Sequence, residues 1–395
     1  MDELVTVVLG VMVAVCAIGV VVFAIAVAGA RALIAPGRRP LTRFRVIEQG
    51  TVDLERTELA RLPGMFGLSY DGGHARVSSI IAESKSIRRK VDAVLGAAIP
   101  TSGSGWWRRD VYRTPDEAGM AYEEVAISTE FGDAAAWVVP PPRGDDSGMW
   151  AVHLHGIRTT RSVVIPSVVA ASRAGMTSLV PSWRNDGEGP TSQRGHSTLG
   201  ATEWLDVDAA VNYAVEAGAR SVVLIGWSLG AAIALLTVTR SAHAGKVAGL
   251  VLIAPVTNWT GVLALAIRTA HLPGLFTTLV GSILRNRILC RLSGLGTPVD
   301  LRQLAPSPQE LDIPALVIHN PGDQLVPFSA TEEFAAAYRG QIELVQFEPC
   351  PHAMEWNTAR ERFDTTLHEW LIQLRLATHS TTSTLIPRNG GDPTT

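Results

Sequence analysis

The sequence predicts an α/β domain with a mostly parallel sheet flanked by helices, preceded by one N-terminal transmembrane helix. Two patterns indicate this: an uncharged run over residues 4–28, and an alternation of short apolar runs with helical patterns over residues 122–376. Of the 395 residues, 47% are hydrophobic and 18% are charged, which is enough apolar material for one large core or two ordinary ones. A disordered chain is therefore excluded.

The uncharged run of residues 4–28 would be about 37 Å long as a helix, and the hydrocarbon core of a bilayer is about 30 Å thick. A cleaved signal peptide is the alternative, with Ala26-Val27-Ala28 as its cleavage site. A signal peptide begins with basic residues, however, whereas this chain begins with Asp2 and Glu3. We therefore expect residues 1–30 to be a retained anchor.

The charges on the two sides of this run differ. Two acidic residues precede it, and five arginines follow it closely: Arg31, Arg38, Arg39, Arg43 and Arg45. Positive charge next to a membrane span tends to stay in the cytoplasm. The sequence therefore predicts a single-pass membrane protein with its N-terminus outside and the bulk of the chain in the cytoplasm.

Composition argues against two classes of partner. The formal net charge of −3 leaves no basic excess for nucleic acid. The three cysteines (Cys16, Cys290 and Cys350) lie far apart and suggest neither a disulfide framework nor a cysteine zinc site. His153 and His155 form an H-x-H pair, but no third ligand follows at a useful spacing. We expect no cofactor and no metal, and we leave protein partners open.

Two segments flank the main domain. Residues 31–121 are interpreted as a juxtamembrane, mixed and β-rich lead-in, with extended candidates at 44–47, 51–54 and 75–81, a charged stretch at 84–94 and a flexible hinge at 102–105. Residues 378–395 are rich in Ser, Thr, Pro and Gly, and we expect a disordered tail there. The sequence of this lead-in indicates no function.

Residues 122–377 form the predicted α/β domain. An antiparallel hairpin is expected from residues 125–128 and 134–139, turning at Gly132-Asp133. Buried strands are expected at residues 150–154, 178–180, 222–225, 250–253, 315–318 and 342–347. The clearest helices are residues 202–217, which Thr202 can cap, 229–239 and 358–376.

A G-x-S-x-G motif at residues 226–230 lies between one of these strands and one of these helices. A serine at such a turn is held in a strained backbone conformation, and the glycines on either side let the strand and helix approach closely enough to expose its hydroxyl. The incidental alternative is an ordinary Gly-Ser turn, but the flanking elements favour a nucleophile. We therefore predict that Ser228 is nucleophilic.

An alcohol needs a nearby base to take its proton and a carboxylate to orient that base. Asp323 follows the predicted strand 315–318, and His352 follows the next strand, 342–347. Both therefore belong at the carboxyl edge of the sheet, although either could instead be an ordinary loop residue. The chain order of Ser228, Asp323 and His352 is the one expected of an α/β-hydrolase.

On these motifs, residues 122–376 resemble the α/β-hydrolase superfamily. The turn His155-Gly156 after strand 150–154 is similar to the family's oxyanion turn, although His155-Gly156-Ile157-Arg158 stands where lipases carry HGGG. The resemblance implies that the backbone N–H groups of Leu229 and Ile157 form an oxyanion hole. Residues 183–189 and 352–357 look most like the bacterial, membrane-linked branch related to prolyl oligopeptidase and BEM46-type hydrolases.

Residues 257–306 stand where this fold commonly carries a cap, and they are unusually apolar, with helical candidates at 262–267 and 275–284. They are either a lid resting on lipid headgroups through Arg285, Arg287 and Arg291, or a cap buried against its own domain. In both cases the cap would shape an apolar substrate site.

Taken together, the sequence predicts a membrane-anchored serine hydrolase of the carboxylesterase or lipase type. It would act on a small-molecule or lipid-like ester through an acyl-enzyme. A peptidase or an acyltransferase of the same fold, and a non-catalytic membrane scaffold, remain alternatives.

Overall fold

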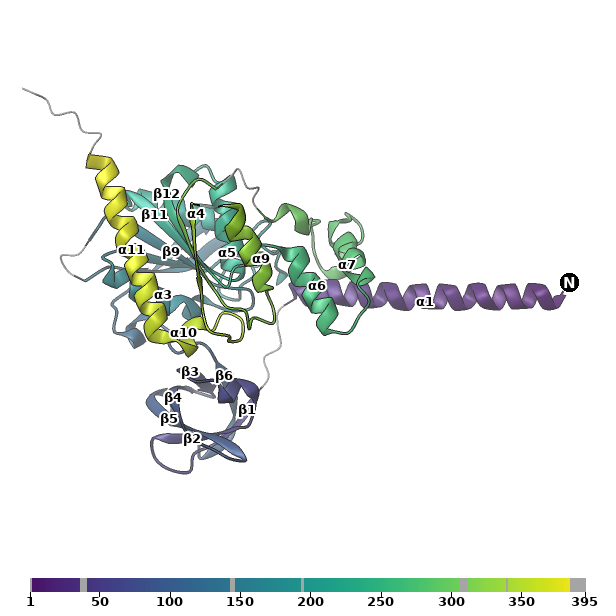
Figure 1. Cartoon of the computed structure of the whole chain (residues 1–395), viewed down its shortest axis with the longest axis horizontal. Coiled ribbons are helices and arrows are strands. Elements are labelled where there is room, and N and C mark those ends of the chain that lie inside the picture. The colour runs from purple at the N-terminus through teal and green to yellow at the C-terminus, as the bar shows by residue number, and fades with distance from the viewer. Residues whose placement is uncertain are drawn as a thin grey trace, which may run out of the picture.

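The structure is a computed structural model, which describes residues 2–35, 41–142, 146–192, 195–305, 311–338 and 340–383. Three parts follow one another along the chain: the long helix α1 (Asp2–Ile34), a small β-barrel and a large α/β domain (Figure 1). Helix α1 projects from the rest of the molecule, and only its C-terminal part lies beside other elements. Arg38 and Arg39, which contribute to the predicted orientation, lie outside the described residues.

Helix α1 is long and apolar enough to cross a bilayer. The candidate span covers Glu3–Ile34, and an 18-residue stretch within it has a mean hydropathy of 3.0. A signal sequence passes the same test of length and composition, so retention of the helix stays a prediction. Near its C-terminal end Ala26, Ala30 and Ile34 are buried against the rest of the molecule.

The lead-in contains a closed antiparallel barrel with the strand order β1-β2-β5-β4-β3-β6. Its strands are β1 (Thr42–Arg45), β2 (Thr51–Glu55), β3 (Phe66–Tyr70), β4 (Gly73–Glu83), β5 (Ser86–Gly96) and β6 (Ser102–Arg108). The short helix α2 (Glu58–Arg61) lies between β2 and β3. Closure leaves no unpaired sheet edge, and it surrounds an apolar core that includes Leu54, Phe66 and Trp107.

The hinge predicted at residues 102–105 is wrong, because these residues are the first half of β6. They pair with β1, from Thr42 opposite Gly105 to Arg45 opposite Ser102. The glycines serve packing rather than flexibility. A Cβ atom on Gly103 would lie 3.1 Å from Phe44 Cζ, and one on Gly105 would lie 2.6 Å from Ser69 O. The charged stretch 84–94 likewise falls largely within strand β5.

Arg89 on β5 is fully buried inside the barrel. Its guanidinium donates four hydrogen bonds of 2.7–2.9 Å to the carbonyl oxygens of Ser78, Ala60, Leu62 and Gly64. It also lies over the rings of Phe66 and Trp107. Burial lowers the pKa of Arg89 to about 10, so the group still carries its charge at neutral pH. This one side chain therefore connects β5 to β4 and to the α2 segment between β2 and β3.

The α/β domain is built on an eight-stranded sheet with the order β14-β13-β12-β11-β9-β10-β8-β7. Its strands are β7 (Glu123–Thr129), β8 (Gly132–Val139), β9 (Met149–Leu154), β10 (Thr177–Pro181), β11 (Ser221–Trp227), β12 (Val247–Ile253), β13 (Ala315–His319) and β14 (Ile342–Gln346). Strands β9 to β14 are mutually parallel, and β8 runs antiparallel to both its neighbours. Each predicted strand is confirmed within a few residues. Strand 342–347 was expected to be buried, but β14 lies at the edge of the sheet and none of its residues is buried.

The hairpin turn lies two residues earlier than predicted. Thr129 pairs with Gly132, so the loop consists of Glu130 and Phe131, and Gly132-Asp133 already belongs to β8. A two-residue connection suits the twist of an antiparallel pair.

Helices cover both faces of the sheet (Figure 1). Helices α3 (Ile165–Arg173), α10 (Glu355–Thr358) and α11 (Arg360–Ser383) pack on one face, and α4 (Trp204–Glu216), α5 (Leu229–Arg240) and α9 (Phe328–Ala337) pack on the other. Glu203 rather than Thr202 immediately precedes α4. Helix α11 continues to Ser383, into the segment expected to be a tail, and residues 384–395 lie outside the described part of the chain.

The cap lies between β12 and β13 and contains helices α6 (Trp259–Thr269), α7 (Leu275–Arg285) and α8 (Cys290–Ser293). Its inward side chains, including Val280, Ile283 and Leu284, share one apolar cluster with α4, α5 and the end of α1. The cap is therefore packed against its own domain on its inner side.

The buried guanidinium gives a stability prediction. Arg89→Met should lower the free energy of unfolding by about 3 kcal/mol, because one buried and three partly buried carbonyl groups lose their donor. Urea unfolding of the full chain in detergent, followed by tryptophan fluorescence, measures this. Arg88→Met is the matched control, since Arg88 is partly exposed and pairs with Asp53 at the barrel surface. Equal losses for the two variants would contradict the role given to Arg89.

Candidate active site

Ser228 lies on a strained turn between β11 and α5. Its backbone has φ of +55° and ψ of −111°, a conformation that L-residues rarely adopt. The flanking glycines permit it. A Cβ atom on Gly226 would lie 2.5 Å from Ala231 Cα, and one on Gly230 would lie 2.2 Å from Leu154 O. The motif therefore brings strand, helix and the neighbouring β9 loop together around the serine.

The structure brings the three predicted site residues into one chain of hydrogen bonds. His352 Nε2 lies 2.7 Å from Ser228 Oγ, and His352 Nδ1 lies 2.5 Å from Asp323 Oδ2. Asp323 is on the loop after β13 and His352 is on the loop after β14, so both occupy the carboxyl edge of the sheet. Ser228 and Asp323 are buried, whereas the His352 side chain keeps 12% of its surface exposed.

The carboxylate of Asp323 is held in its charged form. Burial alone would raise its pKa, but hydrogen bonds from His319, His352 and the Val326 N–H outweigh burial and hold the pKa of Asp323 well below its ordinary range. An ionised Asp323 accepts from His352 Nδ1–H, which leaves Nε2 of that ring to face the serine hydroxyl. This is the tautomer that a general base requires.

His319, which sequence reasoning missed, is a second histidine on the same carboxylate. Its Nε2 lies 2.9 Å from Asp323 Oδ2, and its Nδ1 lies 2.8 Å from Thr331 Oγ1. It is the last residue of β13, one residue beyond the end of the predicted strand 315–318. The only signal was its position four residues before Asp323, which does not distinguish it from a core histidine.

Two more unpredicted residues join the acid loop to the histidine loop. Asn320 Oδ1 accepts from the backbone N–H groups of Gly322 and Cys350, both at 2.9 Å. Asn320 Nδ2 donates to Glu355 Oε1 at 2.7 Å. Glu355 is completely buried, burial raises its pKa, and its Oε2 has no hydrogen-bond partner within the described residues. The loop that carries Asp323 and the loop that carries His352 are thus held together by hydrogen bonds.

The two proposed oxyanion donors flank Ser228. Leu229 is the first residue of α5, and N–H groups in a first helical turn have no intrahelical acceptor. On the other side, a Cβ atom on Gly156 would lie 3.3 Å from Ser228 Cβ, so the turn that leads into Ile157 lies against the nucleophile. His155 anchors that turn by stacking on Trp183 and by bonding Asp186 at 3.0 Å. Donation by Leu229 and Ile157 remains a prediction.

Arg109, also missed, extends from the segment after the barrel into the same space. A Cβ atom on Gly156 would lie 3.7 Å from Arg109 Nη2, so one atom placed there would contact both the guanidinium and Ser228. Arg109 Nη1 donates to Ala353 O, next to His352, at 3.3 Å. A positive charge therefore lies next to Ser228 and to the turn that leads into Ile157.

The barrel is fixed to the histidine loop as well. Asn357 Nδ2 donates to Met65 O at 2.7 Å and to Arg109 O at 2.9 Å. Only glycine fits at position 64, where φ is +100° and a Cβ atom would lie 1.8 Å from Asn357 O. The lead-in is therefore part of the surroundings of the site.

One histidine and one cysteine outside the triad are buried in the domain. His153 is fully buried between Ser167 Oγ and Ser178 Oγ, and burial lowers its pKa to about 3. Burial raises the pKa of Cys350 to about 12, so its thiol stays protonated. Among the described residues, no group of three metal-ligating side chains gathers.

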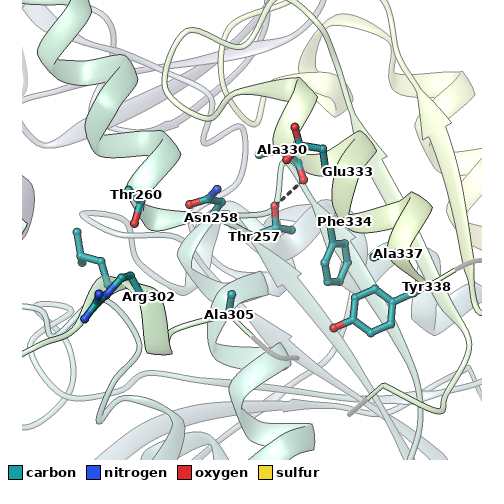
Figure 2. A pocket seen from close by; sticks show the side chains of 11 residues that line it. Thr257, Asn258, Thr260, Arg302, Ala305, Ala330, Glu333, Phe334, Ala337 and Tyr338 are labelled. Carbon is teal, nitrogen blue, oxygen red and sulfur yellow. Dashed lines mark hydrogen bonds between the residues drawn. The ribbon is translucent and has the colours of Figure 1, made fainter. Parts of the chain in front are cut away.

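An open pocket of about 460 Å³ lies between the cap and α9, at one side of the site. Figure 2 shows Phe334 and Tyr338 along one wall and Arg302 on the opposite wall, with Thr257 bonded to Ala330 between them. The triad residues do not line it. Thr257 nevertheless follows directly on Val256, whose N–H donates to Ser228 O.

Comparisons with known proteins agree with this fold. Residues 143–364 match the family model described as "Alpha/beta hydrolase family". Residues 44–108, which form the barrel, match a "Domain of unknown function (DUF8805)". A search of curated proteins found no match.

Among solved structures, an esterase of Pyrococcus furiosus, Pf2001, is similar with a TM-score of 0.52 and 19% identity, covering 66% of this chain and 94% of that one. A hyperthermophilic esterase of Pyrobaculum calidifontis has a TM-score of 0.48 and 17% identity, covering 67% and 89% of the two chains. At these identities the first likeness shows the fold alone.

The neutral, buried His153 gives a pH prediction. The unfolded chain binds a proton here below about pH 6.5 while the folded chain does not, so stability is lost as the pH falls from about 6.5 toward 3. The loss should reach up to about 1.4 kcal/mol per pH unit. His153→Gln should flatten this slope, and His271→Gln, at an exposed position, should keep it. Unfolding measured across this pH range tests the difference, and equal slopes in the two variants would contradict it.

Proposed function

The chain belongs to the alpha/beta hydrolase family, and we propose that it is a membrane-anchored serine hydrolase that cleaves a carboxylic ester with an acyl or lipid-like group. The observation that carries this proposal is the unbroken chain of hydrogen bonds from Asp323 through His352 to Ser228. Such a chain couples a nucleophile to a base of the correct tautomer. No cofactor or metal is part of the proposal.

In this mechanism Ser228 Oγ attacks the ester carbonyl carbon while His352 Nε2 takes its proton. The N–H groups of Leu229 and Ile157 stabilise the oxyanion, and the Arg109 guanidinium adds positive charge nearby. His352 then protonates the departing alcohol, which leaves an acyl-enzyme on Ser228. Water, deprotonated by His352, then attacks the acyl group. The carboxylic acid is released and the free Ser228 hydroxyl is regenerated.

Three features favour an ester over other substrates. The similar structure from Pyrococcus furiosus is named an esterase. The cap that begins next to Ser228 is apolar, which suits an acyl chain. The candidate membrane helix would hold the enzyme where lipid-like esters are concentrated. The membrane-linked branch related to prolyl oligopeptidase, suggested by residues 183–189, stays a prediction.

We also propose that α1 is a retained anchor with its N-terminus outside, so that the catalytic domain is cytoplasmic. Asp2 and Glu3 before the helix and Arg31, Arg43 and Arg45 after it support this orientation. A reporter enzyme that folds only outside the cytoplasm, fused after Thr395, should be inactive. An active reporter would reverse the proposed topology.

Kinetics on a soluble ester test the triad. Against p-nitrophenyl butyrate, Ser228→Ala and His352→Ala should each lose about 10⁴- to 10⁶-fold in kcat, because each removes one member of a cooperating unit. Asp323→Asn should lose about 10⁴-fold, because the histidine would be held in the wrong tautomer. Ser241→Ala, whose hydroxyl bonds Asp208 away from the triad, is the control. Retention of full activity by Ser228→Ala would reject the mechanism.

Product analysis separates hydrolysis from transfer. With wild-type protein and p-nitrophenyl butyrate, we expect free butyric acid as the main product in the presence or absence of glycerol. A butyryl ester of glycerol as the main product would instead identify an acyltransferase, and faster cleavage of a peptide p-nitroanilide would identify a peptidase.

A further inference from the structure

Helix α1 is divided into a free part and a packed part. Residues 3–21 are exposed on all sides, and burial begins at Val22. The free part is about 28 Å long, close to the roughly 30 Å thickness of a bilayer hydrocarbon core. If the free part occupies the bilayer, the elements packed on the remainder lie at the membrane surface.

Those elements are the cap helices α7 and α8, which both contact α1. Figure 1 shows α7 beside the C-terminal part of α1. Small residues allow close packing there: a Cβ atom on Gly29 would lie only 3.3 Å from Val280 Cγ2. Arg31 Nε donates to Leu292 O at 3.0 Å. Arg158, directly after Ile157, donates to Ala32 O and to Ala35 O at the C-terminal end of α1. Hydrogen bonds therefore connect α1 both to the cap and to the turn that contains Ile157.

The same cap segments expose large apolar side chains. Leu275 begins α7, Ile288 lies between α7 and α8, and Leu292 lies in α8, with exposed fractions of 55%, 75% and 44%. Ile288 is the most exposed large apolar side chain among the described residues. The turn that presents it is fixed, because Asn286 Oδ1 accepts from the N–H groups of Ile288 and Leu289. Exposed apolar groups held in this way indicate a contact surface.

The positive charge of the cap indicates which kind of partner this surface contacts. Residues 257–299 contain four arginines and no acidic residue, although the whole chain has a net charge of −3. Arg285, Arg287 and Arg291 are exposed beside the apolar side chains. An apolar surface bordered by arginines and adjoining a membrane-spanning helix matches a bilayer with anionic headgroups better than a second copy of this acidic chain.

We propose that the cap surface formed by Leu275, Ile288, Leu292 and the three neighbouring arginines rests on an anionic bilayer, where the apolar side chains enter the headgroup and acyl boundary. This rests on the proposed anchoring of α1. Because the cap begins beside Ser228, the surface would also place the site next to its substrate, an ester carried by the membrane itself.

Fluorescence of the full chain tests the contact. In a Cys16→Ala background, Ile288→Cys and, as a control on the barrel, Ile81→Cys are labelled with an environment-sensitive nitrobenzoxadiazole. Ile81 is 53% exposed on β4, remote from the cap in the sequence. In vesicles of phosphatidylcholine with phosphatidylglycerol, the label at 288 should shift to the blue and resist iodide quenching severalfold better than the label at 81. Equal quenching at both positions would overturn the proposal.

Activity gives a second readout. The triple variant Leu275→Ser, Ile288→Ser and Leu292→Ser should hydrolyse soluble p-nitrophenyl butyrate at the wild-type rate but lose about tenfold or more on a diacylglycerol carried in the same vesicles. Equal rates for variant and wild type on the vesicle substrate would contradict the membrane contact. A shielded label at 288 in a protein without hydrolase activity would reject the proposed function and leave the contact standing.

Discussion

The backbone of Ser228 is held at a φ of +55°, a conformation that costs a non-glycine residue about 1–3 kcal/mol. The structure can maintain it only because β11, α5 and the end of β9 meet at this point without side chains between them. Gly226 and Gly230 make that close approach possible, since a Cβ atom at either place would overlap backbone atoms. The position of the candidate nucleophile therefore depends on packing in the centre of the sheet.

The rest of the site depends on one buried carboxylate. Asp323 accepts hydrogen bonds from two histidines and from backbone N–H groups, so its charge is stabilised although it is removed from water. Asn320 and Glu355 connect its loop to the histidine loop, and Asn357 connects the histidine loop to the barrel. Arg109 brings a charge from the same lead-in beside Ser228. The loop of Asp323, the loop of His352 and the lead-in are distant in sequence. Together they fix the positions of the side chains around Ser228.

The sequence predicts a site residue well when the residues that identify it are close to it in the chain. The G-x-S-x-G turn needs only five consecutive residues and its flanking elements. Asp323 and His352 each follow a recognisable strand, although only the strand before Asp323 is buried. The barrel was not foreseen, because its closure depends on pairing between strands as distant as β1 and β6. Glycines 103 and 105 were interpreted as a hinge because their packing against Phe44 and Ser69 O is not visible in the sequence. His319, Arg109 and Glu355 carry no motif, and only the fold shows what they contact.

In the proposed mechanism His352 activates Ser228 for nucleophilic attack. Peptide mass spectrometry after treatment of the folded full chain with a fluorophosphonate tests it directly. We expect a single phosphonyl adduct on Ser228, and we expect that adduct to be absent when His352 is replaced by alanine. An adduct on a different serine, or no adduct on the folded wild-type protein, would contradict the claim.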